Sequence, residues 1–253
     1  MSNRIRLLAP SDVPQALELS RATLWDQTAA DWNLVIEMNP AGCFAMESDG
    51  VLAATTTSIR YGVDLAWIGM VVTHPEFRGR GFARALMQHA LDRLDVKTVK
   101  LDATEMGRPL YQKLGFVDEC PIERWVRSPR PTPSIAVDEF TPNPALDREA
   151  FGADRGALLA TLAKIEAASF GDAFAMGRGK RFGPCVSRSK EAALALAAWR
   201  NADQPMVWDL FPENNLAQRL GFEFSRRVTR MVRGRELRSN HSLIYACAGF
   251  EFG

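Results

Sequence analysis

Several features that would fix a functional class are scarce in this chain of 253 residues. The cysteines Cys43, Cys120, Cys185 and Cys247 lie far apart and form no redox or metal-binding motif, which favours buried, reduced thiols in a cytoplasmic protein. No apolar run approaches the roughly 18 residues that a membrane span needs, and the N-terminus lacks the apolar core of a signal peptide. The net charge is only +1, so composition points to neither a nucleic-acid partner nor a membrane partner.

The composition that remains is that of an ordinary globular protein. Hydrophobic residues make up 47% of the chain and charged residues 24%, which supports a sizeable core in one large or two small domains. The clearest linker is SPRPTPS at 128–134, where three prolines exclude regular structure and stiffen the chain. We therefore predict a first domain over 1–127, a linker over 128–134 and a second domain over 135–253.

The order strand, glycine-rich loop, helix marks residues 65–91. Residues 65–72 are apolar and read as a buried strand, and apolar residues recur at helical spacing after Gly81. Because glycine tolerates positive φ and the first amides of a helix lack partners, loop 74–81 is suited to bind phosphate or another anion. The glycine spacing matches neither a P-loop nor the dinucleotide-binding fingerprint. A turn of this kind also occurs without a ligand, merely to reverse the chain.

The remaining pattern alternates strands with helices throughout the chain. In the first half we predict a strand at 5–8, helices after Ser11 and over 29–38, a hairpin over 42–62, a strand at 96–103, a short helix at 107–114 and a strand at 116–126. In the second half we predict a strand near 135, helices within 147–170, strands near 173 and 184, a helix at 190–200, a strand at 206–210, a short helix at 213–220 and long final strands.

The two halves of the chain resemble each other. Residues 110–116 (LYQKLGF) match 216–222 (LAQRLGF) at an offset of 106, whereas residues 72–73 match 186–187 at an offset of 114. The difference of eight equals the length of loop 74–81. We interpret the second half as a copy of the first from which this loop is deleted. If the loop holds an anion, only the first half can do so.

Three segments of the first half together resemble the GNAT superfamily of N-acetyltransferases. They are the strand ending at Val72, the segment RGRGFA at 78–83, and the Leu-Tyr-x-x-Leu-Gly-Phe segment about thirty residues later. The family loop pattern Arg/Gln-x-x-Gly-x-Gly/Ala is met by Arg78, Gly81 and Ala83. The second half is similar to the degenerate C-terminal domains of tandem GNAT proteins. The resemblance implies an α/β fold of the α+β type with a mixed sheet. The fold would be arranged as two tandem GNAT-like domains.

The resemblance also implies a site for acetyl-CoA as co-substrate, with no metal. The loop amides would hold the pyrophosphate, and the strand would splay at a bulge whose free backbone groups pair with the pantetheine and polarise the thioester. Tyr111 would protonate the leaving thiolate, and Thr104 stands where many members carry a CoA-contacting asparagine. The implied cofactor-binding residues are Met70, Val71, Val72, Arg78, Gly79, Arg80, Gly81, Phe82, Ala83, Arg84 and Thr104.

These features predict an acetyl-CoA-dependent N-acetyltransferase that acts on a primary amine of a small molecule or a peptide. The second half should be free of CoA, because it lacks the loop and carries Ala217 at the position of Tyr111. Two alternatives stay open: an acyl-CoA-binding sensor or interaction module without turnover, and an enzyme that transfers longer acyl chains or modifies protein lysines. The sequence specifies neither the acceptor nor the oligomeric state.

Two groups of charged residues, the candidate general bases and an arginine-rich segment, are not assigned a specific function by the sequence. The general base stays open among five carboxylates, each of which is commonly a solvated surface group. Arginines crowd residues 226–238, but no aromatic residues interleave with them, so we expect a solvated strand and turn rather than a nucleic-acid site. The candidate bases are Asp26, Asp31, Glu37, Asp102 and Glu105.

Overall fold

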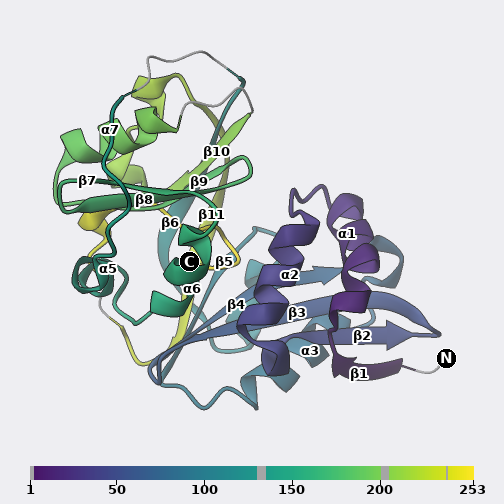
Figure 1. Ribbon diagram of the computed structural model, residues 1–253. Coiled ribbons are helices and arrows are strands. Elements are labelled where there is room, and N and C mark those ends of the chain that lie inside the picture. The colour runs from purple at the N-terminus through teal and green to yellow at the C-terminus, as the bar shows by residue number, and fades with distance from the viewer. Residues whose placement is uncertain (1–2, 130–134, 201–204, 238) are drawn as a thin grey trace.

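The structure is a computed structural model that describes residues 3–129, 135–200, 205–237 and 239–253. The two halves of the chain form two lobes, and one sheet of 12 strands passes through both (Figure 1). The predicted mixed α/β architecture is confirmed. Residues 130–134 of the predicted linker lie outside the described residues, so the division into domains at this point stays a prediction.

In the first half, every expected helix and strand is present at or near its predicted position. Local chemistry explains individual boundaries: Thr28 begins the second helix by exchanging hydrogen bonds with Asp31, a capping box that satisfies two free amides. The elements are β1 (Asn3–Leu7), α1 (Val13–Ala22), α2 (Ala29–Met38), β2 (Phe44–Ser48), β3 (Val51–Tyr61), β4 (Leu65–Thr73), α3 (Phe82–Leu91), β5 (Thr98–Ala103), α4 (Arg108–Lys113) and β6 (Val117–Arg127).

The second half repeats this order with local differences from the prediction. The region expected to be helical over 147–170 holds two helices and a strand, because Gly152 ends the first helix in a left-handed conformation (φ 89°). The helix predicted at 213–220 is two short 3-10 turns, and the strand predicted near 135 is a single bridge between Asp138 and Ser169. The elements are α5 (Pro144–Phe151), α6 (Gly156–Ala163), β7 (Ala167–Phe170), β8 (Ala173–Arg178), β9 (Arg181–Val186), α7 (Lys190–Trp199), β10 (Met206–Leu210), β11 (Glu223–Gly234) and β12 (Ile244–Ala246).

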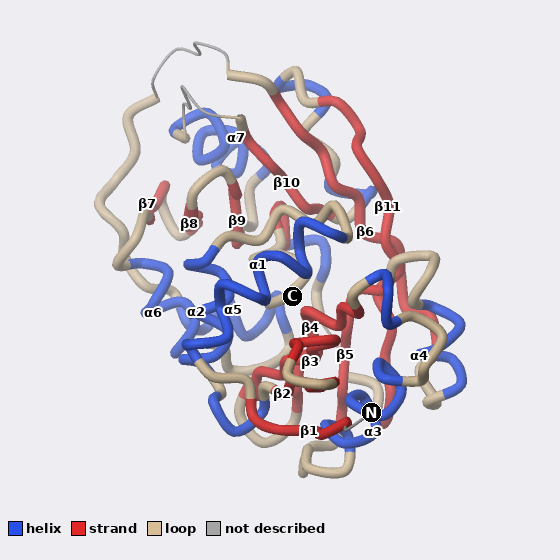
Figure 2. The backbone as a smooth tube through the Cα atoms, turned by 90° about the vertical axis from the view of Figure 1, so that its right-hand side faces the viewer, coloured by secondary structure: helices blue, strands red, loops and turns tan. Residues whose placement is uncertain are grey.

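The two halves exchange a strand. The central part of the sheet has the order β4-β5-β11-β6-β10-β9, so β11 of the second half lies between β5 and β6 of the first. Figure 2 shows the long strands β6 and β11 running alongside each other down one side of the molecule. Each half contains one parallel strand pair, β4–β5 in the first half and β9–β10 in the second. The next strand of the sheet comes from the other half in both cases: β11 pairs with β5, and β6 pairs with β10.

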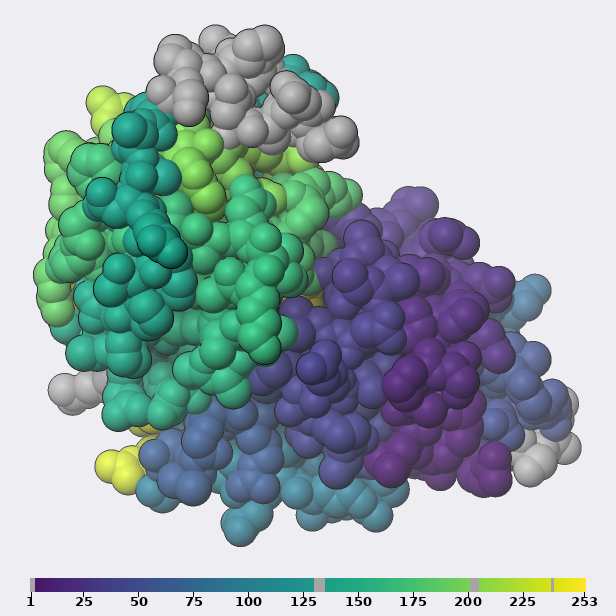
Figure 3. Space-filling model, viewed as in Figure 1, coloured from purple at the N-terminus to yellow at the C-terminus, as the bar shows by residue number. Residues whose placement is uncertain are grey.

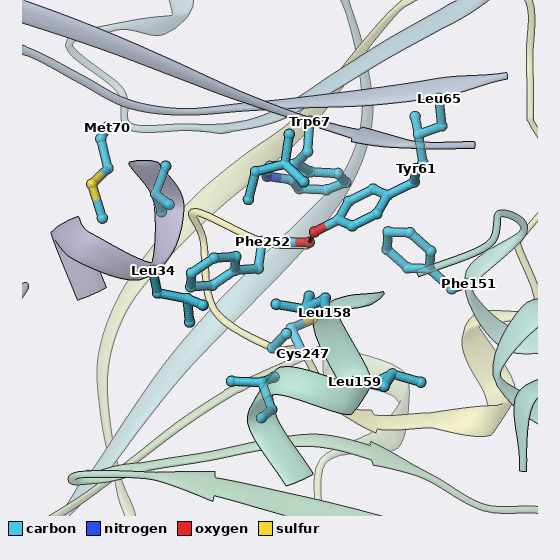
Figure 4. Packing of buried hydrophobic residues seen from close by; sticks show 14 of the residues in the cluster. Leu34, Tyr61, Leu65, Trp67, Met70, Phe151, Leu158, Leu159, Cys247 and Phe252 are labelled. Carbon is cyan, nitrogen blue, oxygen red and sulfur yellow. Dashed lines mark hydrogen bonds between the residues drawn. The ribbon is translucent and has the colours of Figure 1, made fainter. Parts of the chain in front are cut away.

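The largest buried apolar cluster joins the two halves, which meet over a broad surface (Figure 3). Figure 4 shows Tyr61, Trp67, Phe151 and Phe252 gathered in it, with the Tyr61 ring edge-on to Phe151 at 5.2 Å between centroids. The Tyr61 hydroxyl donates to the Phe252 carbonyl (2.8 Å), and Trp67 Nε1 donates to the Phe250 carbonyl (2.9 Å). These bonds hold the C-terminal turn against β3 and β4. No helix in the described parts of the chain is both long and apolar enough to cross a bilayer.

The arginine-rich strand β11 is less solvated than the sequence suggests. Arg227 and Arg233 are exposed, but Arg230 is only 2% exposed and donates to both carboxylate oxygens of Asp102 (2.9 and 3.0 Å). Side chains alternate along a strand, so Arg226 and Arg230 lie on the same face of β11. The first half covers that face at Arg230, and the expectation of a solvated strand is wrong there.

Candidate active site

A cleft opens where β4 and β5 separate. The two strands pair in parallel only between 65–67 and 98–100, and farther along them the gap widens into a cleft of about 520 Å³. Residues from both faces of the sheet line this cleft, which therefore reaches through it. One face carries α3 and α4, which pack on β5 and Met231, and the other carries α1 and α2, which pack with Val228.

The predicted β-bulge is present in β4 beside the cleft. Gly69 and Val72 pair with residues of β3 that are only two positions apart, so Met70 and Val71 together face a single residue. Met70 has a φ of 46°, which is uncommon for a residue other than glycine, and its carbonyl accepts a hydrogen bond from the Thr55 hydroxyl (2.8 Å). On the β5 side, no described strand pairs with this part of β4. Its backbone groups on that side are available to a ligand.

Loop 74–81 forms the rim of the cleft where α3 begins. Gly79 and Gly81 adopt left-handed conformations with φ of 77° and 78°, which a side chain would strain. Gly81 is the N-cap of α3 and offers no side-chain acceptor, so the first amides of the helix stay free for an anion. Arg80 differs from its neighbours: its guanidinium lies over the Phe77 ring at 4.9 Å, and it is not among the residues that line the cleft.

Tyr111 of α4 lines the same side of the cleft. Its side chain is buried, with the ring edge-on to Phe116, and no described residue hydrogen-bonds to its hydroxyl. Burial raises the pKa of Tyr111 above its ordinary value, so the hydroxyl stays protonated and can donate. Thr104 also lines the cleft, and its hydroxyl accepts from the Gly107 amide (3.3 Å) ahead of α4. The predicted cofactor residues that line the cleft are Met70, Val71, Val72, Arg78, Gly79, Gly81, Phe82, Ala83, Arg84 and Thr104.

The opposite side of the cleft is built largely from residues that the sequence did not single out. Part of this wall comes from the α1–α2 connection and part from the second half, through β11 and the C-terminal turn. No local motif marks these residues, and strand pairing and the C-terminal turn bring those of the second half in from more than a hundred positions away. They are Thr23, Trp25, Gln27, Arg226, Val228, Phe250 and Glu251.

Of the five candidate bases, Asp102 is the one that lines the described part of the cleft. Glu37 and Glu105 are exposed and do not line the cleft. Asp31 caps α2 and forms an ion pair with Arg178. Asp26 is held by three cations, which keep its pKa well below the ordinary value although burial opposes ionisation. These partners are Arg181 at 2.8 Å, Arg124 at 3.0 Å and Lys180 at 3.1 Å.

Two carboxylates line the described part of the cleft, and both are paired with arginine. Asp102 accepts both hydrogen bonds that the Arg230 guanidinium offers it. Glu251, which the sequence did not indicate, accepts from Arg178 (2.8 Å) and lies 3.9 Å from Arg181. Although burial opposes ionisation, Arg181 and Arg178 lower the pKa of Glu251. Each carboxylate therefore has an arginine as its principal partner.

The corresponding place in the second half is filled by the chain itself. Only residues 187–189 connect β9 to α7, so the glycine loop is absent as predicted. Strand β12 pairs with β9 next to β10, and the Cys247 amide donates to the Asp209 carbonyl (2.7 Å). Trp208 Nε1 donates to the Tyr245 carbonyl (2.7 Å) in the same region. The backbone groups that a pantetheine arm would need are thus already paired.

Comparison with known families identifies both halves. Residues 12–116 match the model of a family described as "Acetyltransferase (GNAT) family", and residues 144–246 match one described as "Acetyltransferase (GNAT) domain". The two matches lie in tandem and together span most of the chain.

Individual relatives agree with this result. The chain is 25% identical to a holothin acyltransferase of Pseudoalteromonas sp., over 93% of this chain and 90% of that protein. It shares its fold with a putative acetyltransferase of Pyrococcus horikoshii (TM-score 0.86, 22% identity, 99% of this chain and 96% of that one). A GCN5-related N-acetyltransferase of Sphaerobacter thermophilus is also similar in fold (TM-score 0.65, 18% identity, 94% and 97% coverage).

Proposed function

Because this chain belongs to the GNAT acetyltransferase family, with one domain of the family in each half, and is an N-acyltransferase, we propose that it transfers acetyl from acetyl-CoA to a primary amine. One observation carries the proposal. A single cleft joins the bulged strand β4, the glycine loop and Tyr111 on one face of the sheet to a second wall on the other face. The two substrates can therefore enter from opposite faces and meet between β4 and β5.

In this proposal the loop, the bulged strand and Tyr111 each have a defined role in the reaction. The amides of 78–84 hold the pyrophosphate of acetyl-CoA, which supplies an activated thioester. A backbone amide on the β5 side of the bulge donates to the carbonyl oxygen on which negative charge develops, whereas Val72, the donor expected from the sequence, is paired with Thr55 of β3. Tyr111 gives its proton to the sulfur that leaves, and the amine reaches the carbonyl from the α1–α2 face.

In this proposal the acceptor amine loses its proton to water, since both lining carboxylates are held by arginines. We expect kcat/KM to fall about tenfold per pH unit below the pKa of the acceptor amine. The measurement compares two acceptors whose amine pKa values differ. The acidic limb of the profile of kcat/KM against pH should shift by the difference between the two amine pKa values. A limb that stays in place for both acceptors would instead identify a base on the protein.

The proposal also predicts one acetyl-CoA site per chain. Gly81→Val should weaken acetyl-CoA binding at least about tenfold, because a β-branched residue resists the left-handed conformation that opens α3. Calorimetric titration measures stoichiometry and affinity together. Gly62→Val is the matched control, since Gly62 has a similar φ (67°) between β3 and β4 and does not line the cleft. Two sites, or equal affinity in both variants, would contradict this placement.

The acyl group and the acceptor are tested by CoA release. Because a curated relative is named an acyltransferase, acetyl-CoA should be compared with longer acyl-CoAs, and the amine screen should include holothin. Turnover fastest with acetyl-CoA supports the proposal. Faster turnover with a longer chain would favour the second alternative. Binding without CoA release in the presence of any amine would favour a sensor.

A further inference from the structure

Strand β11 brings one arginine of the second half into the wall of the cleft. Arg226 is half-buried there, and its strand neighbour across the pairing is Arg124 of β6. In the described parts of the chain, Arg226 makes no hydrogen bond and no ion pair, and its Nε is buried without a partner. A half-buried guanidinium without a counter-ion is unusual, because desolvation of its charge is not offset.

An aromatic ring holds this guanidinium in place. The Arg226 guanidinium carbon lies 5.3 Å from the centre of the Phe250 ring, and that of Arg124 lies 4.1 Å from it. Phe250 is itself fixed, because its carbonyl accepts from Trp67 Nε1. Contact with an aromatic ring favours a cation but leaves the planar fork of N–H donors free for an acceptor group.

The charges around this wall compensate Arg226 only in part, through Asp26 and Asp209. The surrounding cluster contains five cations and four carboxylates, and all four carboxylates are engaged by the other cations. Burial and the neighbouring Arg124 lower the pKa of Arg226, which means that the site disfavours this positive charge. An anion bound beside Arg226 would remove that imbalance. The cluster consists of Arg124, Arg178, Lys180, Arg181, Arg226, Asp26, Asp31, Asp209 and Glu251.

Two further properties of this side of the cleft indicate what else the ligand carries besides an anionic group. Gln27 lines the cleft with a buried Oε1 that has no partner among the described residues, so it can accept a hydrogen bond from an N–H group. Trp25, Met70, Val228 and Phe250 surround these polar groups with apolar surface.

We propose that the acceptor is an amino acid with a free amino group and an apolar side chain, and that Arg226 binds its carboxylate. The guanidinium fork matches a carboxylate in shape and charge, and Gln27 Oε1 accepts from the amine. This inference rests on the proposed acetyl transfer and specifies its substrate class. It makes the second half a specificity element, since β11 delivers the arginine into the cleft of the first.

The test compares matched acceptors with and without a carboxylate. The pairs are phenylalanine with phenethylamine and leucine with 3-methylbutylamine, with kcat/KM expressed per neutral amine at saturating acetyl-CoA. The native protein should favour the amino acid by about 10- to 100-fold. Arg226→Ala should abolish this preference by slowing the amino acids alone, and Arg226→Lys should retain part of it, because lysine keeps the charge without the fork. Arg227→Ala is the control, since Arg227 neighbours Arg226 on β11, is exposed and does not line the cleft.

Equal use of both members of each pair, or a preference that survives Arg226→Ala, would overturn the inference while leaving acetyl transfer intact. If the protein binds acetyl-CoA but acetylates none of the four amines, calorimetry with N-acetylphenylalanine in the presence of CoA decides. Binding that Arg226→Ala abolishes supports the inference, and absent or unchanged binding overturns it. Failure to bind acetyl-CoA at all would overturn the proposed function, and this inference with it.

Discussion

Replacement of Tyr111 by phenylalanine is expected to lower kcat about 10³-fold while acetyl-CoA affinity changes less than about twofold. The substitution removes only the hydroxyl, and the ring keeps its edge-on contact with Phe116. An unperturbed thiol has a pKa of about 8.5, so a leaving thiolate gains from a donor held beside it. Burial raises the pKa of Tyr111, so this hydroxyl stays protonated throughout the neutral pH range in which activity is measured.

The control for this variant is Tyr245→Phe. It makes the same chemical change in the second half, at a buried tyrosine that does not line the cleft. Stopped-flow or steady-state CoA release measures kcat, and calorimetry measures binding. If Tyr111→Phe keeps native kcat, the leaving group receives its proton from another source, such as water. If both tyrosine variants lose activity equally, the loss reflects folding.

Arg230→Met should lower the free energy of unfolding by about 3–5 kcal/mol. Arg230 is 2% exposed, and its guanidinium carbon lies 4.6 Å from the centre of the Trp67 ring and 5.1 Å from that of Phe211. Its removal leaves the buried Asp102 carboxylate without its cation. Burial opposes both charges: it raises the pKa of Asp102, and it would lower that of Arg230, which Asp102 instead raises. The two hydrogen bonds between the guanidinium and the carboxylate favour the ionic form of the pair. Urea unfolding measures the change in midpoint and slope.

Two variants separate the charge effect from simple loss of contacts. Adding Asp102→Asn to Arg230→Met should recover part of the stability, because no uncompensated charge then remains buried. Arg233→Met, at an exposed position of the same strand, should change stability by no more than about 0.5 kcal/mol. A cost for Arg230→Met as small as that of Arg233→Met would show that the pair contributes little to joining the two halves.

Local features of this protein follow from the sequence alone. The apolar strand, the left-handed glycines and the helix that starts at once fix the loop conformation through short-range backbone preferences. The repeat of the LGF segment with its shifted offset revealed both the duplication and the missing loop. The bulge and the site roles came from family resemblance, and the structure bears out the bulge itself. In the second half the patterns were weaker, and Gly152 divided one expected helical region.

The tertiary structure alone decided which distant residues complete the cleft. Strand pairing depends on backbone hydrogen bonds that every residue offers, so the sequence does not indicate that β11 inserts beside β5 or that β6 crosses to β10. That insertion distinguishes arginines that look alike in sequence. It buries Arg230 on Asp102, leaves Arg233 exposed, and places Arg226 in the cleft. Long-range pairing thus assigns each of them its environment, and the environment determines what the same guanidinium does.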